Sequence, residues 1–172
     1  PDGTYTAIAL RPDWRQVASS PGVVEGTRPR RLAILLDTSR SALEHKRLAL
    51  DTLRGVLDGL SAEDRFLLLA SDLTCQRLTA TWQHRGAGAA VALAAVEAWE
   101  FDGASDLGAA LACAVEALAE PAAASADQLI YIGDGVPTWG EVDARALVDG
   151  YAPALEGVEP HAALLGRGAD DD

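Results

Sequence analysis

Three oxygen-bearing side chains follow a short apolar run at alternate positions. The run covers residues 32–36, and Asp37, Ser39 and Ser41 come directly after it. Alternate side chains of an extended segment point the same way, so these oxygens can face one point. Carboxylate and hydroxyl oxygens are ligands that hard divalent cations such as Mg²⁺ prefer. A turn with a helix cap is the other interpretation, because Ser41 and Glu44 have the spacing of a capping box.

A second aspartate ends another apolar run, much further along the chain. Asp134 lies in the segment QLIYIGDG, residues 128–135. Ligands of parallel α/β sheets bind beyond the carboxyl ends of the strands, where both Asp37 and Asp134 are placed. If the two strands are neighbours, the carboxylates converge. A site rich in hydroxyls would leave positive charge on a bound cation, and that charge can attract a carboxylate from a partner.

The elements that must position these residues alternate between apolar runs and helical patterns. An α/β fold is predicted: a Rossmann-like, doubly wound, mostly parallel sheet with helices on both faces and one antiparallel edge strand. We predict strands over residues 5–10, 32–36, 65–71, 76–83, 128–135 and 161–168, the fourth being the edge strand, and helices over residues 42–60, 86–99, 106–119 and 142–155. Asp106 is interpreted as the first-turn acid of its helix, not as a ligand.

Composition limits the classes of function. The 172 residues suit one domain, and a net charge of −12 argues against general binding to nucleic acid or anionic membranes. The longest apolar stretch is too short to cross a membrane. The chain has no methionine, even at position 1, so we expect a processed form or part of something longer. Cys75 and Cys113 lack metal-ligand spacing, and we expect two small buried hydrophobic residues rather than a disulfide.

Three motifs in order carry a family resemblance. The segments are DTSRS (residues 37–41), GASDLGAAL (residues 103–111) and YIGDGVPTWGE (residues 131–141). They resemble the motifs of von Willebrand factor type A (vWA) domains, and the resemblance covers residues 31–168. It implies a metal-ion-dependent adhesion site for Mg²⁺, Mn²⁺ or Ca²⁺ that engages an Asp or Glu of a protein partner. The ligands implied are Asp37, Ser39, Ser41, Ser105 and Asp134.

Within the third motif, the run DGVPTWGE (residues 134–141) is most similar to vWA domains that follow a VIT module, as in inter-alpha-trypsin inhibitor heavy chains. Residues 1–30 would then be an N-terminal strand and connector, the strand ending or leading out of that module. Residues 31–168 would form the vWA domain without its last helix, and residues 169–172 an acidic tail. The compartment stays open, with a secreted or cell-surface setting favoured over a cytoplasmic one.

Two residues depart from the family pattern. Ser105 replaces the usual threonine and keeps the hydroxyl, while Arg40 replaces the small glycine between the two serines. The Arg40 guanidinium could repel a metal or form a second contact to an acidic partner. Trp139 follows Asp134 in a loop that should border the site, so Arg40 and Trp139 are the candidate partner-binding residues.

Two other functions compete with metal-dependent binding. A vWA scaffold with a weak or vestigial metal site could serve as a docking domain in a larger complex. A Mg²⁺-dependent phosphotransfer enzyme would use a strand-end aspartate as a nucleophile. Such sites generally also have a lysine positioned to contact the phosphate. The only lysine, Lys46, lies inside a predicted helix, and the sequence has no P-loop or dinucleotide fingerprint. We therefore expect no catalysis.

Overall fold

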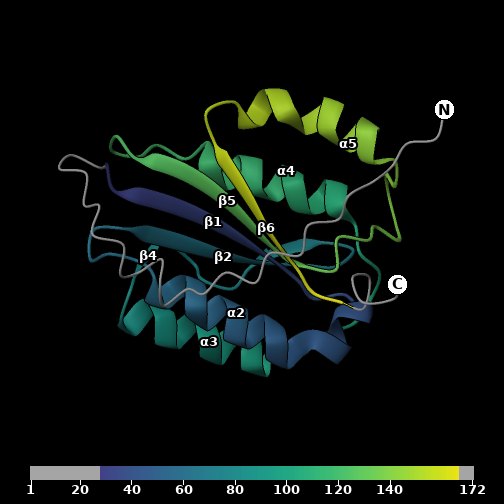
Figure 1. Cartoon of the computed structure of the whole chain (residues 1–172), viewed down its shortest axis with the longest axis horizontal. Coiled ribbons are helices and arrows are strands. Elements are labelled where there is room, and N and C mark those ends of the chain that lie inside the picture. Colours follow the sequence, from purple (N-terminus) through teal and green to yellow (C-terminus); the bar gives the residue numbers. More distant parts are fainter. Residues whose placement is uncertain (1–27, 167–172) are drawn as a thin grey trace, which may run out of the picture.

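The computed structural model describes residues 28–166 and shows a sheet between two layers of helices (Figure 1). The strands follow the order β3 (Cys75–Arg77), β2 (Arg65–Ser71), β1 (Arg30–Asp37), β5 (Ala126–Gly133) and β6 (Glu159–Leu164). A short strand, β4 (Gln83–His84), also pairs with β2. Strands β1, β2, β5 and β6 are parallel, whereas β3 and β4 run antiparallel to β2. The predicted fold class is confirmed.

Helices cover both faces of the sheet. A 3₁₀ helix, η1 (Ser41–His45), leads into α2 (Lys46–Asp58), which lies with α3 (Ala87–Ala98) on one face. The other face carries α4 (Leu107–Leu118) and α5 (Ala144–Tyr151), the latter continued by the 3₁₀ helix η2 (Ala152–Leu155) (Figure 1). None of the helices in residues 28–166 combines the length and apolarity needed to cross a bilayer.

Strand β1 is the centre of the core, which explains its continuous apolar run. Ile34 packs with Leu53 on the α2 side, while Leu35 packs with Ala114 on the α4 side. Each of these four side chains is fully buried. Burying one large aliphatic side chain stabilises the fold by roughly 1.5–3 kcal/mol, so both faces of β1 hold the end of the strand, and with it Asp37, in a fixed place.

Two predicted elements differ in detail. The predicted edge strand over residues 76–83 is interrupted, because the Thr79 hydroxyl accepts the Leu68 N–H (3.0 Å) in place of a backbone carbonyl. The predicted capping box at Ser41 is wrong. The Ser41 side chain makes no cap and contacts Ser39 and Asp134 instead.

A disulfide joins Cys75 of β3 to Cys113 of α4, with Cα atoms 6.2 Å apart. The expectation of two separate buried hydrophobic residues is therefore wrong. The two cysteines are 38 positions apart in the sequence, and they meet only because α4 packs across the edge of the sheet at β3. The bond fixes the edge strand to the helix that begins beside Ser105.

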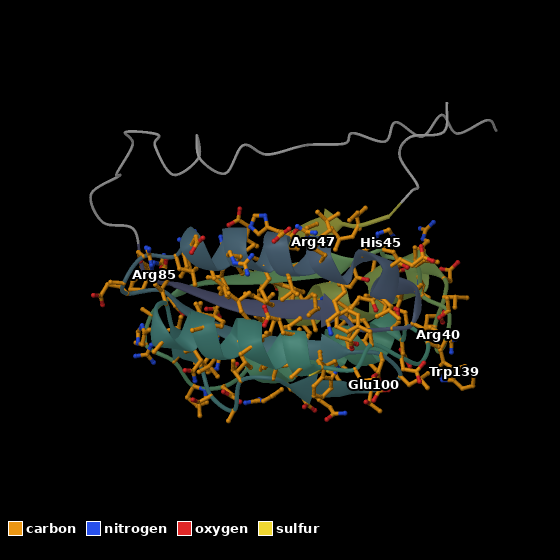
Figure 2. The ribbon with its side chains drawn as sticks, turned by 90° about the horizontal axis from the view of Figure 1, so that it is seen from below. Arg40, His45, Arg47, Arg85, Glu100 and Trp139 are labelled. Carbon is orange, nitrogen blue, oxygen red and sulfur yellow. A yellow bond between two sulfur atoms is a disulfide. The ribbon has the colours of Figure 1, made fainter. Side chains whose placement is uncertain are left out.

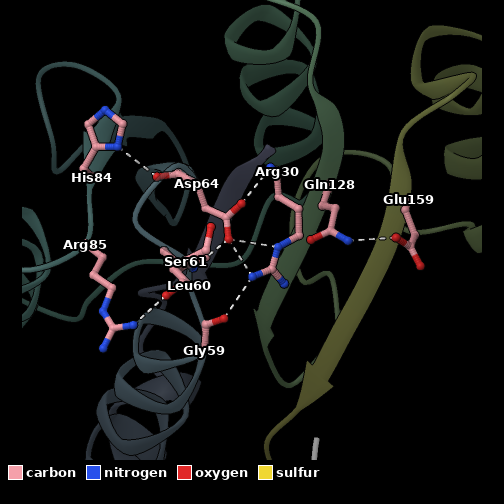
Figure 3. Close-up of polar contacts among 9 residues, drawn as sticks. All are labelled: Arg30, Gly59, Leu60, Ser61, Asp64, His84, Arg85, Gln128 and Glu159. Carbon is pink, nitrogen blue, oxygen red and sulfur yellow. Dashed lines mark hydrogen bonds and ion pairs between the residues drawn. The ribbon is translucent and has the colours of Figure 1, made fainter. Parts of the chain in front are cut away.

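Buried charges at the amino ends of the strands are paired within the protein (Figure 3). Asp64 is 3% exposed and accepts hydrogen bonds from Arg30 Nη2 (2.6 Å), Arg30 N (2.7 Å) and Ser61 N (2.8 Å). Burial opposes ionisation of Asp64, but these donors outweigh it and lower its pKa to about 2. Arg31 is likewise paired with Asp127 at 2.6 Å.

Several predictions fall outside residues 28–166. These are the strand over residues 5–10, almost all of the connector that follows it, the last two residues of the strand predicted over 161–168, and the acidic tail over residues 169–172. They remain predictions, as do the domain boundaries drawn from them.

The Asp64 network predicts a specific loss of stability in acid. Because the folded pKa of Asp64 lies below its ordinary value of 3.8, the carboxylate stabilises the fold above about pH 4, by about 2 kcal/mol. That stabilisation is lost as the pH falls from about 4 to 2. Asp64→Asn should lower the free energy of unfolding at neutral pH and flatten this acid dependence, measured by denaturant unfolding. Asp58→Asn, at an exposed position, is the control. An unchanged acid profile in Asp64→Asn would contradict the assignment.

Candidate functional site

The loop after β1 is fixed by backbone hydrogen bonds on both sides. Thr38 N–H donates to the Ser71 carbonyl at the end of β2 (2.8 Å). Arg40 N–H donates to the Gly103 carbonyl (3.0 Å) in the loop between α3 and α4. The side chains that follow Asp37 are therefore held by two neighbouring segments at the carboxyl edge of the sheet.

The five predicted ligands form a continuous chain of hydrogen bonds. Ser105 Oγ donates to Asp37 Oδ2 (3.4 Å), and Asp37 Oδ1 accepts from the Ser39 N–H (2.8 Å). Ser39 Oγ and Ser41 Oγ are 3.1 Å apart. Ser41 Oγ donates to Asp134 Oδ2 (2.9 Å). Strands β1 and β5 are direct neighbours in the sheet, so residues far apart in the sequence gather at one point.

Asp37 is a buried carboxylate that no cationic side chain of residues 28–166 pairs. It is 2% exposed, and its hydrogen-bond donors among the described residues are neutral: a backbone N–H and two hydroxyls. No ion pair involving Asp37 occurs within residues 28–166, whereas the equally buried Asp64 is paired with Arg30. A buried carboxylate without a cation is costly, and such groups are usually paired or coordinate a metal. The position is chemically suited to a cation from outside the chain.

The donor set fits an oxygen-seeking divalent cation. Two carboxylates and three hydroxyls make up the chain of five residues. Within residues 28–166 there is no group of three or more His, Cys, Asp or Glu side chains that could hold a metal, so a cation here would depend on the serine hydroxyls as well. Mg²⁺ requires six oxygens in a near-octahedral shell. If each residue supplied one oxygen, directly or through water, one position would remain for water or an external ligand.

Tyr131 also touches Asp37, and sequence reasoning missed it. Its hydroxyl donates to Asp37 Oδ2 (3.1 Å) and accepts the Gly135 N–H (3.2 Å). Burial raises the pKa of Tyr131, and the Asp37 charge raises it further, so the phenol stays protonated and can donate. The sequence offered only a weak signal for this contact. Tyr131 and Gly133 are two residues apart in one strand and therefore lie on the same face of it.

The two candidate partner-binding residues lie at the same end of the molecule (Figure 2). The Arg40 side chain is 82% exposed, and its Nη1 lies 3.9 Å from Asp102 Oδ1. Trp139 is 62% exposed, and its backbone N–H donates to the Ser105 carbonyl (3.1 Å). Within residues 28–166, no hydrogen bond or ion pair joins the Arg40 side chain to the five residues. Trp139 is attached to the Ser105 loop through its backbone.

Asp106 has a structural role. It caps the amino end of α4, where its Oδ1 accepts the Ala109 N–H at 2.9 Å. This confirms its interpretation as an acid at the start of that helix. The position of Ser105, one residue earlier, is fixed further by Thr138 Oγ1, which accepts the Ser105 N–H (2.9 Å).

Comparison with solved structures shows the same fold at low sequence identity. A von Willebrand factor type A protein from Catenulispora acidiphila aligns over 81% of this chain and 34% of its own, with a TM-score of 0.65 and 16% identity. The pilus adhesin SpaC from Lactobacillus rhamnosus GG aligns over 66% of this chain and 16% of its own (TM-score 0.58, 16% identity). The SpRpn10 VWA domain aligns over 82% of this chain and 77% of its own (TM-score 0.58, 16% identity). This chain thus spans about a third or less of the first two proteins.

Comparison with curated protein sequences gave no match. The family profile described as the von Willebrand factor type A domain, however, matches residues 30–162. That range includes every strand and helix from β1 to α5, together with all five residues of the candidate site. The chain therefore belongs to the von Willebrand factor type A domain family.

Proposed function

We propose that this domain binds a divalent cation at the carboxyl edge of its sheet and uses it to bind a protein partner. Mg²⁺ is the proposed ion, with Mn²⁺ or Ca²⁺ as alternatives, and the partner supplies an Asp or Glu to the metal. The observation that carries the proposal is the buried carboxylate of Asp37, which no cationic side chain of residues 28–166 pairs. The proposed ligands are Asp37, Ser39, Ser41, Ser105 and Asp134.

A binding role is consistent with the family. Domains of this family often act in protein binding or adhesion, and pilus adhesins are among the proteins of similar fold. Arg40 and Trp139 support such a role, because both side chains are exposed beside the site. We assign Trp139 to apolar contact with the partner and Arg40 to pairing with its carboxylate, since tryptophan and arginine are enriched at interface hot spots.

A docking scaffold with a vestigial site is the second candidate. It is favoured by the hydrogen bond from Ser41 to Asp134, through which the proposed ligands partly satisfy one another without a cation. Phosphotransfer is disfavoured by the position of Lys46. Its ammonium donates to the carbonyls of Trp99 (2.8 Å) and Glu97 (3.1 Å) and so is held away from Asp37.

The setting of the domain is also part of the proposal. A disulfide between Cys75 and Cys113 supports a secreted or cell-surface location, because such bonds persist mainly in oxidising compartments. The likeness to vWA domains that follow a VIT module rests on residues 134–141 alone. Sequence upstream of residue 1 would test that placement directly.

Replacing Asp37 is the direct test of the metal site. Asp37→Ala should abolish binding of Mg²⁺ and Mn²⁺ in calorimetric titration, because it removes the buried carboxylate on which the proposed shell depends. Asp102→Ala is the matched control, since Asp102 is an exposed carboxylate at the same end of the molecule. If the parent protein binds neither ion, the docking alternative replaces this proposal. Equal affinity of Asp37→Ala and the parent would place the ion elsewhere.

Ser105 provides a second test with a matched pair of variants. Its hydroxyl is buried beside Asp37. Ser105→Thr keeps the hydroxyl and should keep metal affinity. Ser105→Val has nearly the same shape as the threonine variant but no hydroxyl, and should weaken metal binding. Loss of one ligand or of its hydrogen bonding should cost roughly tenfold or more in affinity. Titration of both variants with Mn²⁺ measures the difference. Indistinguishable affinities would show that Ser105 only begins the helix.

A further inference from the structure

We propose that Tyr131 is a positioning residue that sets the geometry between the two carboxylates of the site. We call its pair of hydrogen bonds, to Asp37 Oδ2 and from the Gly135 N–H, the Tyr131 bridge. The inference rests on the proposed function, because it assigns Tyr131 a role toward the cation held there.

Strand register explains how Tyr131 reaches Asp37. Tyr131 of β5 lies opposite Leu35 of β1, two residues before Asp37. The long phenol side chain spans this offset and brings its hydroxyl to the carboxyl edge of the sheet. Its ring borders a cavity of about 540 Å³ between the sheet, α4 and α5, lined mostly by apolar side chains such as Leu111 and Leu147. The ring also packs against the buried cluster that includes Leu35, so it is anchored independently of the hydroxyl.

Gly133 provides the space that the bridge occupies. A Cβ atom added at Gly133 would collide with the Tyr131 hydroxyl and would lie 2.5 Å from Asp37 Cβ. Real Cβ atoms essentially never approach other heavy atoms so closely. Residues 131 and 133 thus act as a matched pair, in which the phenol hydroxyl fills the volume that a side chain at 133 would otherwise take.

The bridge connects the two halves of the site. Gly135 directly follows Asp134, whose Oδ1 accepts the Val136 N–H (2.9 Å). The Gly135 N–H donates to the Tyr131 hydroxyl, which in turn donates to Asp37. The bridge therefore links the loop that carries the Asp134 carboxylate to the Asp37 carboxylate. Without the hydroxyl, the one hydrogen bond left to Asp37 Oδ2 within residues 28–166 would be the long 3.4 Å contact from Ser105. Groups that orient metal ligands in this way typically change metal affinity by 10–100-fold when removed.

The test compares Tyr131→Phe with Tyr151→Phe. Both changes remove one hydroxyl at the same cavity, but no hydrogen bond of the Tyr151 hydroxyl is found within residues 28–166. Calorimetric titration with Mn²⁺ and Mg²⁺ should show roughly tenfold or greater weakening in Tyr131→Phe and no change in Tyr151→Phe. If the parent binds the ion and Tyr131→Phe binds it equally well, the positioning role is wrong.

Amide hydrogen exchange in the metal-free protein separates this inference from the proposed function. Tyr131→Phe should speed exchange at Gly135, which loses its acceptor, and leave the buried Leu35 amide of β1 unchanged. If the parent binds no cation, the proposed function fails while faster exchange at Gly135 alone still supports the bridge. Unchanged exchange at Gly135, or equal acceleration at Leu35, would overturn it.

Discussion

The Asp37 carboxylate is buried at the end of the central strand, and no cationic side chain of residues 28–166 is paired with it. This is the constraint around which this end of the domain is built. Burial of an unpaired carboxylate is expensive, and backbone and hydroxyl donors offset only part of the cost. The fold supplies those donors from three segments: the loop after β1, the start of α4 and strand β5. Burial of both faces of β1 prevents the strand from shifting to bring Asp37 into water.

Within residues 28–166, the buried charged side chains at one end of the sheet are in ion pairs, whereas the buried Asp37 at the other end is not. At the amino ends of the strands, the buried Asp64 is paired with Arg30 and the buried Arg31 with Asp127, so each buried charge has a partner of opposite sign. At the carboxyl ends, serine and tyrosine hydroxyls surround Asp37 without neutralising it. The first end is thus stabilised by pairs within the protein, whereas the second end is where we propose that a cation and then an acidic partner bind.

Much of the fold and of the site was predictable because both depend on local patterns. Continuous apolar runs identified the buried strands, and the strand-end positions of Asp37 and Asp134 placed them at one edge of a parallel sheet. Features that depend on packing between distant elements were not predictable. The Cys75–Cys113 disulfide requires α4 to lie over β3, and the break in the edge strand depends on the single hydroxyl of Thr79. Contact between Tyr131 and Asp37 requires the register of β1 and β5.

The most direct measurement of the central claim is the free energy of unfolding of the parent and of Asp37→Asn, each with EDTA and with Mg²⁺ or Mn²⁺. A cation that compensates the Asp37 charge in the folded protein should stabilise the parent by about 2.7 kcal/mol at a concentration one hundredfold above its Kd. The same cation should leave the stability of Asp37→Asn unchanged. An equal response of both proteins to the cation, or no response of the parent, would contradict the account, because the Asp37 charge would then not be the group that the ion balances.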